Sequence, residues 1–417
     1  MRSLSALLCF LLALSLSVLA HASEPGTDLT ISLLTMGPGE HPFTKFGHSA
    51  IWVHDAQTGR DEVYNYGTFA FDSPTLLLDS VAGKLPYWLS VQSYRGTLRS
   101  YGEAGRSVQA SELELTPAQR VALYAALRDN ERPEHRYYRY DYYRDNCATR
   151  IRDVIDGVIA GRIQAQTRPT PASMSFREHT LRLVADDALL YAGLDLAIGR
   201  ETDAPITFWD EAFLPQKLHE ALSRTRVMQN GRALPLIRSE RSLLTSKLAA
   251  PRVAPPQWSS RYQLVGLCLG ACFGLLGWAA YSRRAARVAL GVAYLVVGGS
   301  LGLLGCALAY LTFFSAHSAA AANYNVLLVP PWLLALAVLG IGVMREKPGV
   351  WRVTGWITVG TFLATDLALL LHLLTTHAQA NAQELAVALP LWMGVAFSAW
   401  LAAPNGRQSK RIPGVQP

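Results

Sequence analysis

Long apolar runs fill the chain from residue 264 onward, and they restrict its fold more than any other feature of the sequence. A transmembrane helix needs roughly 20 predominantly apolar residues to cross the hydrocarbon core of a bilayer. Five segments reach or approach that length, namely residues 264–281, 288–314, 326–344, 351–374 and 385–401. The sequence therefore predicts an all-α bundle of five transmembrane helices.

Lys and Arg residues occupy alternate connections of this predicted bundle. Basic clusters follow the first, third and fifth segments: Arg283, Arg284 and Arg287; Arg345, Lys347 and Arg352; and Arg407, Lys410 and Arg411. The connections at residues 315–325 and 375–384 contain neither Lys nor Arg. Because basic loops stay in the cytoplasm, we expect the chain to enter the membrane from outside and to end inside.

The N-terminus has the pattern of a secretory signal peptide. Arg2 precedes an apolar stretch over residues 7–19, and residues 20–22 (Ala-His-Ala) form a small-x-small cleavage site. An uncleaved signal anchor is the alternative, and both interpretations export the segment that follows. We therefore expect a multi-pass protein of the bacterial inner membrane with its N-terminal domain in the periplasm.

Composition divides the chain into a predicted signal peptide (1–22), an exported domain (23–250), a linker (251–262), a transmembrane domain (263–402) and a cytoplasmic tail (403–417). The net charge of +7 does not mark a nucleic-acid-binding protein, because residues 23–250 contain 26 Lys+Arg against 28 Asp+Glu. The basic excess lies beside the apolar runs, where it indicates topology rather than a phosphate-binding surface. No nucleic-acid partner is expected.

Local patterns place the elements of the exported domain. We expect strands over residues 29–35, 46–53, 62–69, 90–101 and 107–115, with the second and third joined as a hairpin by a turn at 57–61. Residues 116–119 form a capping-box start for a helix that ends near residue 130. Another helix begins at or just before Cys147, with Asp145 or Asn146 as its N-cap. Residues 165–245 are expected to be mostly helical.

Cys147 is the single cysteine of the predicted exported domain. Cys9 lies in the signal peptide, and Cys268, Cys272 and Cys306 lie in the membrane segments. An unpaired thiol in an oxidising compartment is a liability unless its chemistry is used. The alternative is that Cys147 serves as a small buried hydrophobe.

The position of Cys147 at a helix start favours a nucleophile. Free N–H groups and the helix dipole lower the pKa of a thiol in the first turn, and the same N–H groups can bind the oxyanion of a tetrahedral intermediate. His48, on the second predicted strand, is the best candidate for the base. Asn65 or Tyr64 on the adjacent strand is within reach to orient the imidazole.

Other histidines and metal chemistry are not expected to contribute. We expect surface positions, in loops or on polar helix faces, for His41, His54, His135, His179 and His219. One cysteine and scattered histidines lack the spacing of a zinc site, and the sequence shows no glycine-rich phosphate-binding loop. The sequence implies no metal and no cofactor.

Three motifs in this order resemble the Lnb family. They are residues 46–49 (Phe-Gly-His-Ser), 64–69 (Tyr-Asn-Tyr-Gly-Thr-Phe) and 145–150 (Asp-Asn-Cys-Ala-Thr-Arg). The resemblance continues through residues 193–195 and 213–215, and into the membrane half at His317, Asn323, Asn325 and Pro330. It covers nearly the whole chain after residue 22.

Proteins of the Lnb family are lipoprotein N-acyltransferases, which acylate the N-terminal amine of lipoproteins. The resemblance implies that Cys147 accepts the acyl chain and that His48 is its base. The histidine precedes the cysteine, an order similar to that of permuted papain-like enzymes such as lecithin:retinol acyltransferase, which take an acyl chain from a phospholipid through a thioester. We therefore expect an α+β permuted papain-like (NlpC-type) domain in front of the five-helix bundle.

Polar residues of the membrane half are candidates for substrate binding. His317, Asn323 and Asn325 lie in a connection on the exported side, where contact with lipid headgroups is an equally good explanation. Asp366 lies inside an apolar run, where a carboxylate is costly unless it faces a polar interior; a hydrogen bond between helices is the alternative. Further candidates come from the motifs around the site: Tyr64, Asn146 and Arg150.

The sequence as a whole favours a thiol acyltransferase. Cys147 would take an acyl chain from a membrane phospholipid as a thioester and pass it to the N-terminal amine of diacylated lipoproteins. Two alternatives stay open, a papain-like peptidoglycan amidase or endopeptidase and a non-enzymatic lipid- or lipoprotein-binding membrane protein. A cell-wall hydrolase has little use for five membrane spans, and the motif contexts of His48 and Cys147 argue against a degenerate site.

Overall fold

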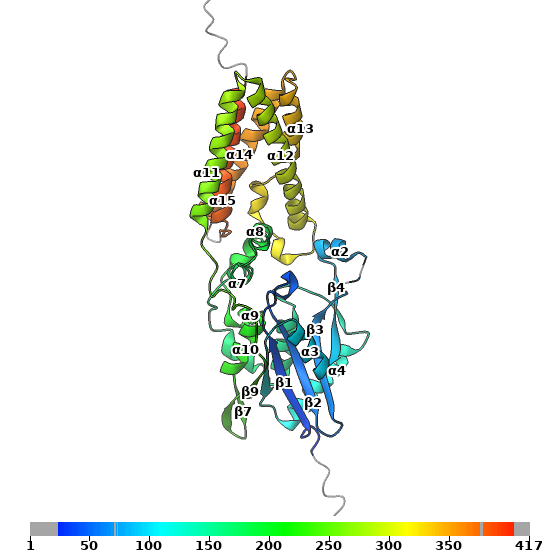
Figure 1. The fold of residues 1–417 in the computed structure, drawn as a ribbon. Coiled ribbons are helices and arrows are strands. Elements are labelled where there is room, and N and C mark those ends of the chain that lie inside the picture. Colours follow the sequence, from blue (N-terminus) through cyan, green and yellow to red (C-terminus); the bar gives the residue numbers. More distant parts are fainter. Residues whose placement is uncertain (1–23, 71, 73, 376–377, 404–417) are drawn as a thin grey trace, which may run out of the picture.

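The computed structural model describes residues 24–403 except 71, 73, 376 and 377. The predicted signal peptide and the residues from 404 onward lie outside the described residues. The molecule is elongated, with a sheet-containing domain at one end, a helix bundle at the other and short helices between them (Figure 1). The chain thus forms an α+β domain followed by a helical domain, as expected.

Seven antiparallel strands form the main sheet, in the spatial order β6-β4-β3-β2-β1-β5-β9. Their bounds are β1 (Leu29–Met36), β2 (His48–Asp55), β3 (Arg60–Thr68), β4 (Pro86–Ser93), β5 (Val108–Leu113), β6 (Tyr137–Arg139) and β9 (Ile237–Leu244). The predicted hairpin of β2 and β3 is confirmed, because Val53 pairs with Glu62 across it. A separate hairpin consists of β7 (Arg226–Gln229) and β8 (Arg232–Pro235).

Helices cover both faces of this sheet. One face carries α4 (Pro117–Glu131), α5 (Cys147–Val158) and α10 (Pro215–Arg224), which bury the main core against strand residues such as Ile31 and Ile51. The other face packs against α3 (Tyr94–Glu103) around Leu34 and Val63. The predicted capping box is present at the start of α4. The helix α5, which begins with Cys147, therefore packs against β2 and β3 in the middle of the sheet.

Two segments of the exported domain differ from expectation. The strand predicted over residues 90–101 ends at Ser93, whose hydroxyl accepts a hydrogen bond from the Gly96 N–H (3.1 Å) and starts α3. Residues 226–244 form strands instead of helix. The strand β9 is largely exposed and lacks an alternating apolar pattern, so only its pairing with β5 defines it.

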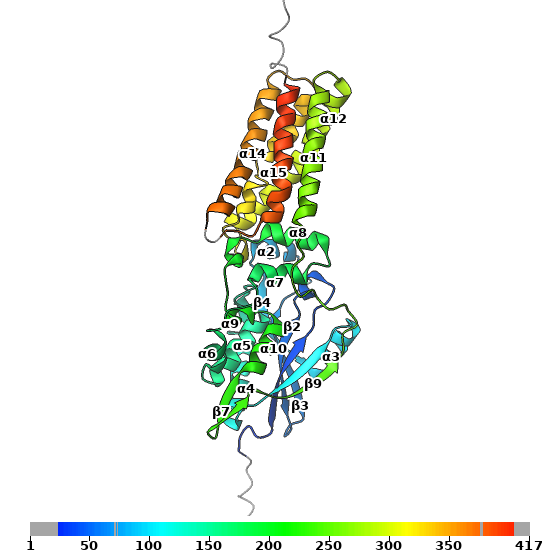
Figure 2. The same cartoon turned by 90° about the vertical axis from the view of Figure 1, so that its left-hand side faces the viewer.

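Short helices fill the region between the sheet and the bundle. They are α2 (Leu76–Ala82), α7 (Phe176–Leu183) and α8 (Ala188–Ala197), whereas α6 (Arg162–Thr167) and α9 (Phe208–Glu211) pack beside α5 and α10. Both views place α8 directly beneath the bundle and α7 one layer further away (Figure 2), whereas α2 lies beside the lower end of α12 (Figure 1). These helices separate the candidate catalytic residues from the membrane domain.

The bundle consists of α11 (Ser259–Ala280), α12 (Arg284–Phe313), α13 (Leu333–Met344), α14 (Val350–Leu374) and α15 (Ala382–Ala402). Within the described residues, all of these except α13 are long and apolar enough to cross a membrane. The helix α13 has 12 residues and spans roughly 18 Å, against a hydrocarbon core of about 30 Å. The predicted third span is therefore wrong in length, because Pro330 and Pro331 cannot continue a helix toward residue 326. The first helix begins at Ser259, inside the predicted linker.

Small residues let the bundle helices approach closely. The helix α11 packs along α15, and α12 packs along α13. A Cβ atom added at Gly394 would lie 2.3 Å from the Gly270 Cα, so neither glycine tolerates a side chain. Such contacts between small residues are the usual way in which membrane helices associate.

Candidate functional site

The helix α5 starts at Cys147 because Asn146 caps it. The Asn146 Oδ1 accepts hydrogen bonds from the N–H groups of Ala148 (2.8 Å) and Thr149 (2.9 Å). The Asn146 Nδ2 donates to the carbonyls of Tyr142 (2.8 Å) and Phe213 (2.9 Å). Of the two predicted N-cap candidates, Asp145 and Asn146, the structure shows Asn146, and all four of these hydrogen bonds fix the start of the helix at Cys147.

His48 is oriented by Asn65 on the neighbouring strand. The His48 Nε2 lies 3.2 Å from the Asn65 Oδ1, and the Asn65 Nδ2 donates to the Val63 carbonyl (3.0 Å). Since the amide nitrogen is thereby used as a donor, Oδ1 is the acceptor and Nε2 carries the proton of the neutral imidazole. The lone pair then resides on Nδ1, as a general base requires.

A bulge brings β3 toward the thiol. The register of β3 against β4 shifts between Asn65 and Thr68, and Gly67 has a φ of +87°. A Cβ atom on Gly67 would lie 3.2 Å from the Tyr140 ring and 3.6 Å from the Cys147 Cβ. Bulges of this kind redirect side chains and are frequent beside active sites.

The thiol faces the start of β2. Strands β2 and β3 pair only from Ile51 onward, and the Ser49 N–H near the start of β2 favours the thiolate form of Cys147. His48 precedes Ser49, and both His48 and Cys147 line the same cavity. Within the described part of the chain no hydrogen bond joins the sulfur to the imidazole directly. The two groups therefore meet at the cavity wall, where a substrate would contact both.

Burial sets the protonation states of this pair. Burial raises the pKa of the Cys147 thiol above its usual range, although the N–H groups of Ser49, Ala148 and Cys147 and the nearby Arg106 favour the thiolate. Burial lowers the pKa of His48 to about 4, against the hydrogen bond to Asn65 and with a contribution from Arg106. The predicted lowering of the thiol pKa is thus wrong, because desolvation outweighs the helix N-terminus. At neutral pH the pair is a thiol and a neutral imidazole.

An apolar cavity of about 460 Å³ connects Cys147 with the bundle. Beside His48 and Cys147 its wall is mainly aromatic, with Phe43, Phe46, Phe69, Tyr87, Tyr140 and Tyr142. Leu190, Leu194 and Ala197 of α8 form another side, and the bundle contributes Leu311, His317, Ala319 and Ala320. The volume is typical of pockets for small or extended ligands.

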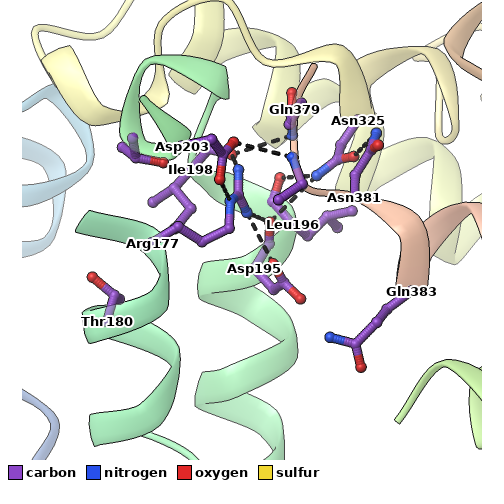
Figure 3. A network of polar contacts seen from close by, with 12 residues as sticks. Arg177, Thr180, Asp195, Leu196, Ile198, Asp203, Asn325, Gln379, Asn381 and Gln383 are labelled. Carbon is purple, nitrogen blue, oxygen red and sulfur yellow. Dashed lines mark hydrogen bonds and ion pairs between the residues drawn. The ribbon is translucent and has the colours of Figure 1, made fainter. Parts of the chain in front are cut away.

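A buried polar network fastens α8 beneath the bundle (Figure 3). The carbonyl groups at the C-terminal end of a helix lack intrahelical partners. Here Arg177 Nη1 and Nη2 donate to the carbonyls of Asp195 and Ile198 (both 2.8 Å). Arg177 also forms ion pairs with the carboxylates of Asp195 (2.9 Å) and Asp203 (2.7 Å).

The bundle contributes the other half of this network. Asn323 Nδ2 donates to the carbonyls of Leu196 (2.8 Å) and Ala197 (3.0 Å), and Asn325 Nδ2 donates to Leu196 (3.1 Å). The amide oxygens of the two asparagines accept hydrogen bonds from Gln379 and Asn381 respectively. Arg177 and the cavity residue Thr180 both lie on α7, so the same helix contributes to the network and to the cavity wall.

Comparison with known families identifies both halves of the chain. The model of the Lnb N-terminal periplasmic domain matches residues 20–186, and the model of the Lnb transmembrane domain matches residues 265–404. The chain belongs to the Lnb family. The α+β domain is therefore periplasmic, and the bundle is the membrane domain. No curated protein and no solved structure matches the chain.

The match to the Lnb periplasmic domain contains His48, Asn65 and Cys147, which the structure brings together. Residues 187–264, which include α8 and Asp203, lie between the two matched segments of this Lnb chain. Arg177 and Asn325 reach this unmatched segment from either side. The network thus joins parts of the molecule that the family models treat separately.

Several predicted substrate-binding residues lie away from the cavity in this Lnb chain. The Tyr64 hydroxyl donates to Glu62 (2.9 Å), and Arg150 pairs with Asp145 (2.6 Å) and lies over the Tyr138 ring. Asn146, Asn323 and Asn325 serve the cap and the network described above. Asp366 is half-buried on α14 and does not line the cavity. His317 does line the cavity, and its Nε2 donates to the Ser80 carbonyl (2.7 Å).

Two polar residues beside the site were not predicted from the sequence. Arg106 is buried, donates through Nε to the Gly37 carbonyl (2.8 Å) and places its charge near both His48 and Cys147. Tyr142 lines the cavity, and its hydroxyl has no hydrogen-bond partner among the described residues. The aromatic run at residues 137–143 was a signal for Tyr142, whereas Arg106 reaches the site only through the tertiary fold.

His179 was expected at the surface but is fully buried. Its Nε2 lies 2.6 Å from Glu211 Oε1, and its Nδ1 accepts a hydrogen bond from Arg182 Nε (3.0 Å). A polar helical sequence gave no sign of this burial, because the partner Glu211 lies on α9. His179 is a structural residue beside Phe213.

The protonation states predict how Cys147 reacts with iodoacetamide in the resting protein. Alkylation should be slow near neutral pH and should accelerate as the pH rises above 9, because burial raises the pKa of the thiol and only the thiolate reacts. Replacing Arg106 with Gln should move this rise to higher pH, since the variant lacks a cation that favours the thiolate. Mass spectrometry of the Cys147 peptide measures the rate. Rapid alkylation at neutral pH would contradict the assignment.

Proposed function

We propose that this protein is a lipoprotein N-acyltransferase that carries an acyl chain on Cys147. His48 Nδ1 accepts the thiol proton as the sulfur attacks an ester carbonyl of a membrane phospholipid. The tetrahedral intermediate collapses to an acyl-thioester, and His48 returns the proton to the departing lysophospholipid oxygen. The N-terminal amine of a diacylated lipoprotein then attacks the thioester, and His48 transfers a proton from the amine to the departing thiolate.

The apolar cavity between Cys147 and the bundle is the observation that supports this proposal best. Its walls are aromatic and aliphatic, and Leu311 of α12 lies in its lining together with Cys147. An acyl chain that leaves the bilayer can therefore stay in an apolar environment up to the thiol. A peptidoglycan stem peptide is polar and charged and finds few polar partners in such a cavity.

The oxyanion would be bound by backbone groups around the sulfur. The Ala148 and Thr149 N–H groups, which the sequence suggested for this role, already donate to Asn146. Of the three N–H groups that favour the thiolate, the Ala148 N–H is already used by Asn146, which leaves those of Ser49 and Cys147. We propose these two donors for the oxyanion, with the free Tyr142 hydroxyl as a third group for the ester.

The proposal includes the architecture that the sequence suggested. A thiol at the start of a helix packed on an antiparallel sheet, with histidine and asparagine on neighbouring strands, supports a permuted papain-like fold for residues 23–250. We propose residues 251–258 as the linker, 259–402 as the inner-membrane domain, which begins with α11, and 403–417 as the cytoplasmic tail. The reaction needs no metal or cofactor.

Loading of the enzyme tests the first half-reaction. The purified protein, incubated with a phospholipid that carries a labelled acyl chain, should become labelled when no acceptor amine is present. Neutral hydroxylamine should release the label, as expected of a thioester, and Cys147→Ala protein should stay unlabelled. A cell-wall hydrolase would instead cleave peptidoglycan stem peptides without lipid label, and a binding protein would do neither.

The distribution of basic loops predicts on which side of the membrane the C-terminus lies. Alkaline phosphatase, which is active only outside the cytoplasm, should be inactive when fused after residue 417, because basic clusters flank the cytoplasmic ends of the bundle. The same reporter fused after residue 250 should be active and serves as the control. An active C-terminal fusion would contradict the proposed topology.

A further inference from the structure

The short helix α2 has an apolar face without a protein partner. Leu77 and Leu78 are 74% and 72% exposed, and Val81 on the same face is 42% exposed. These residues lie at i, i+1 and i+4, so they form one stripe of the helix. Exposed large side chains of this kind on a periplasmic domain indicate a contact that the chain alone does not supply.

Contacts with the loop after α12 fix α2 at the end of the bundle. The Ala316 N–H donates to the Ala82 carbonyl (2.8 Å), and His317 Nε2 donates to the Ser80 carbonyl (2.7 Å). Gly83 ends the helix with a φ of +68°, and a Cβ atom there would lie 3.0 Å from the Ala316 carbonyl carbon. Figure 1 shows α2 beside the lower end of α12. The carbonyls that end α2 are thus capped by the membrane domain itself.

The helix α2 lies beside the end of α12, whose last residues are also exposed and apolar (Figure 1). Phe313 and Phe314, the last residues of that span and its C-cap, are 67% and 76% exposed. Leu303, two to three turns earlier, is likewise exposed on the surface that the bundle presents to lipid. The exposed Lys84 follows α2 directly, and a lysine beside an apolar face can extend its ammonium group to anionic or zwitterionic headgroups. A bilayer therefore accounts for this apolar surface better than a protein partner does.

The cavity passes beneath this surface. Ser80, Gly83 and Leu85 at the end of α2 line it, and so does Leu311, which lies one turn before the end of α12. The loop at residues 315–317 joins α2 to the end of α12 through the two hydrogen bonds described above. The ends of α2 and α12 therefore both form part of the cavity wall.

We propose that α2 rests in the outer surface of the bilayer and that, with Phe313 and Phe314, it forms an apolar lip through which the acyl chain of a phospholipid enters the cavity. The bilayer contact is inferred from the exposed apolar residues and from their position at the end of a membrane-spanning helix. The entry of the acyl chain rests on the proposed function. Leu77 and Leu78 would insert among acyl chains, and Lys84 would lie at the phosphate layer.

Photo-crosslinking tests the bilayer contact. The full-length protein in nanodiscs of phosphatidylethanolamine and phosphatidylglycerol, with p-benzoylphenylalanine in place of Leu78, should form phospholipid adducts on irradiation. The same residue in place of Met228 should form none, because Met228 is 53% exposed on β7, at the end of the molecule farthest from the bundle (Figures 1 and 2). Absence of a lipid adduct at position 78 overturns the proposal.

Loading of Cys147 from two donors tests the entry of the acyl chain. The double variant Leu77→Glu, Leu78→Glu should load at least 10-fold more slowly than wild type from bilayer phospholipid and at the wild-type rate from p-nitrophenyl butyrate. Met228→Glu should load like wild type from both. A double variant that loads normally from phospholipid, or equally slowly from both donors, would refute the proposal that the acyl chain enters past α2. A wild-type protein that loads from neither donor while the adduct still forms refutes the proposed function and leaves the bilayer contact established.

Discussion

Replacing His48 with Ala should slow acyl loading of Cys147 by roughly 10²–10⁴-fold, the usual contribution of a positioned general base. The Cys147 thiol is neutral at physiological pH because burial raises its pKa, so it depends on His48 to become a nucleophile. Single-turnover labelling with excess phospholipid measures the loading rate directly. His54→Ala is the matched control, since His54 lies on the same strand, bonded to Asp61 at its exposed end. An equal loss in both variants would exclude His48 as the base.

The same assay should separate Asn65 from His48. Asn65→Ala removes the acceptor of the Nε2 proton but leaves the imidazole, so its loss should be smaller than that of His48→Ala. In the wild type, loading should persist as the pH falls from 7 to 5 and should fail near pH 4. Burial lowers the pKa of His48 to about 4, and a protonated imidazole cannot accept the thiol proton. Loss of loading near pH 6.5 would show an unperturbed histidine.

Replacing Arg177 with Met should destabilise the folded protein by about 3–5 kcal/mol, as expected when one partner of a buried ion pair is removed. The guanidinium is almost completely buried and pairs with Asp195 and Asp203, and it also caps the carbonyls that end α8. Without it, two buried carboxylates and two carbonyl groups lose their main partner. Since α8 forms one wall of the cavity, the variant should also load Cys147 poorly.

Thermal unfolding in detergent, followed by circular dichroism, measures this destabilisation. Arg128→Met provides the control, because Arg128 forms a solvent-exposed pair with Glu131 (2.8 Å), worth at most about 1 kcal/mol. The midpoint should fall far more for Arg177→Met than for Arg128→Met. Similar midpoints for the two variants would show that the network in Figure 3 adds little to stability.

Local signals in the sequence predicted the elements that depend on neighbouring residues. The hairpin of β2 and β3, the capping box at Thr116 and the helix start at Cys147 all follow from turn and cap chemistry within a few positions. Elements that depend on distant partners were missed. The edge strand β9, for example, is defined by its pairing with β5. The length of α13 was mispredicted for another reason, because a Pro-Pro pair, itself a local signal, interrupts an apolar run that otherwise looks continuous.

In the candidate site, too, features set by local sequence were predicted and features set by the whole fold were not. The sequence placed His48, Asn65 and Cys147 in one site and left Tyr64, on the same strand, as the alternative to Asn65; in the structure Asn65 forms the hydrogen bond to His48. The direction of the pKa shift of the Cys147 thiol was mispredicted. The helix N-terminus, which lowers this pKa, is visible in the local sequence, whereas the burial that raises it is produced by the whole fold. Arg106 was missed for the same reason, since it approaches the site from between α3 and β5.

Transfer of the acyl chain from Cys147 to an amine tests the central claim most directly. Enzyme loaded from labelled phospholipid and freed of excess lipid is mixed with a diacylated lipopeptide that has a free N-terminal amine, and the label is followed by mass spectrometry. We expect it to move to the peptide as an amide that resists hydroxylamine, and an N-acetylated lipopeptide should receive none. If the label stays on the protein or is lost to water at the same rate with either peptide, Cys147 does not acylate lipoproteins.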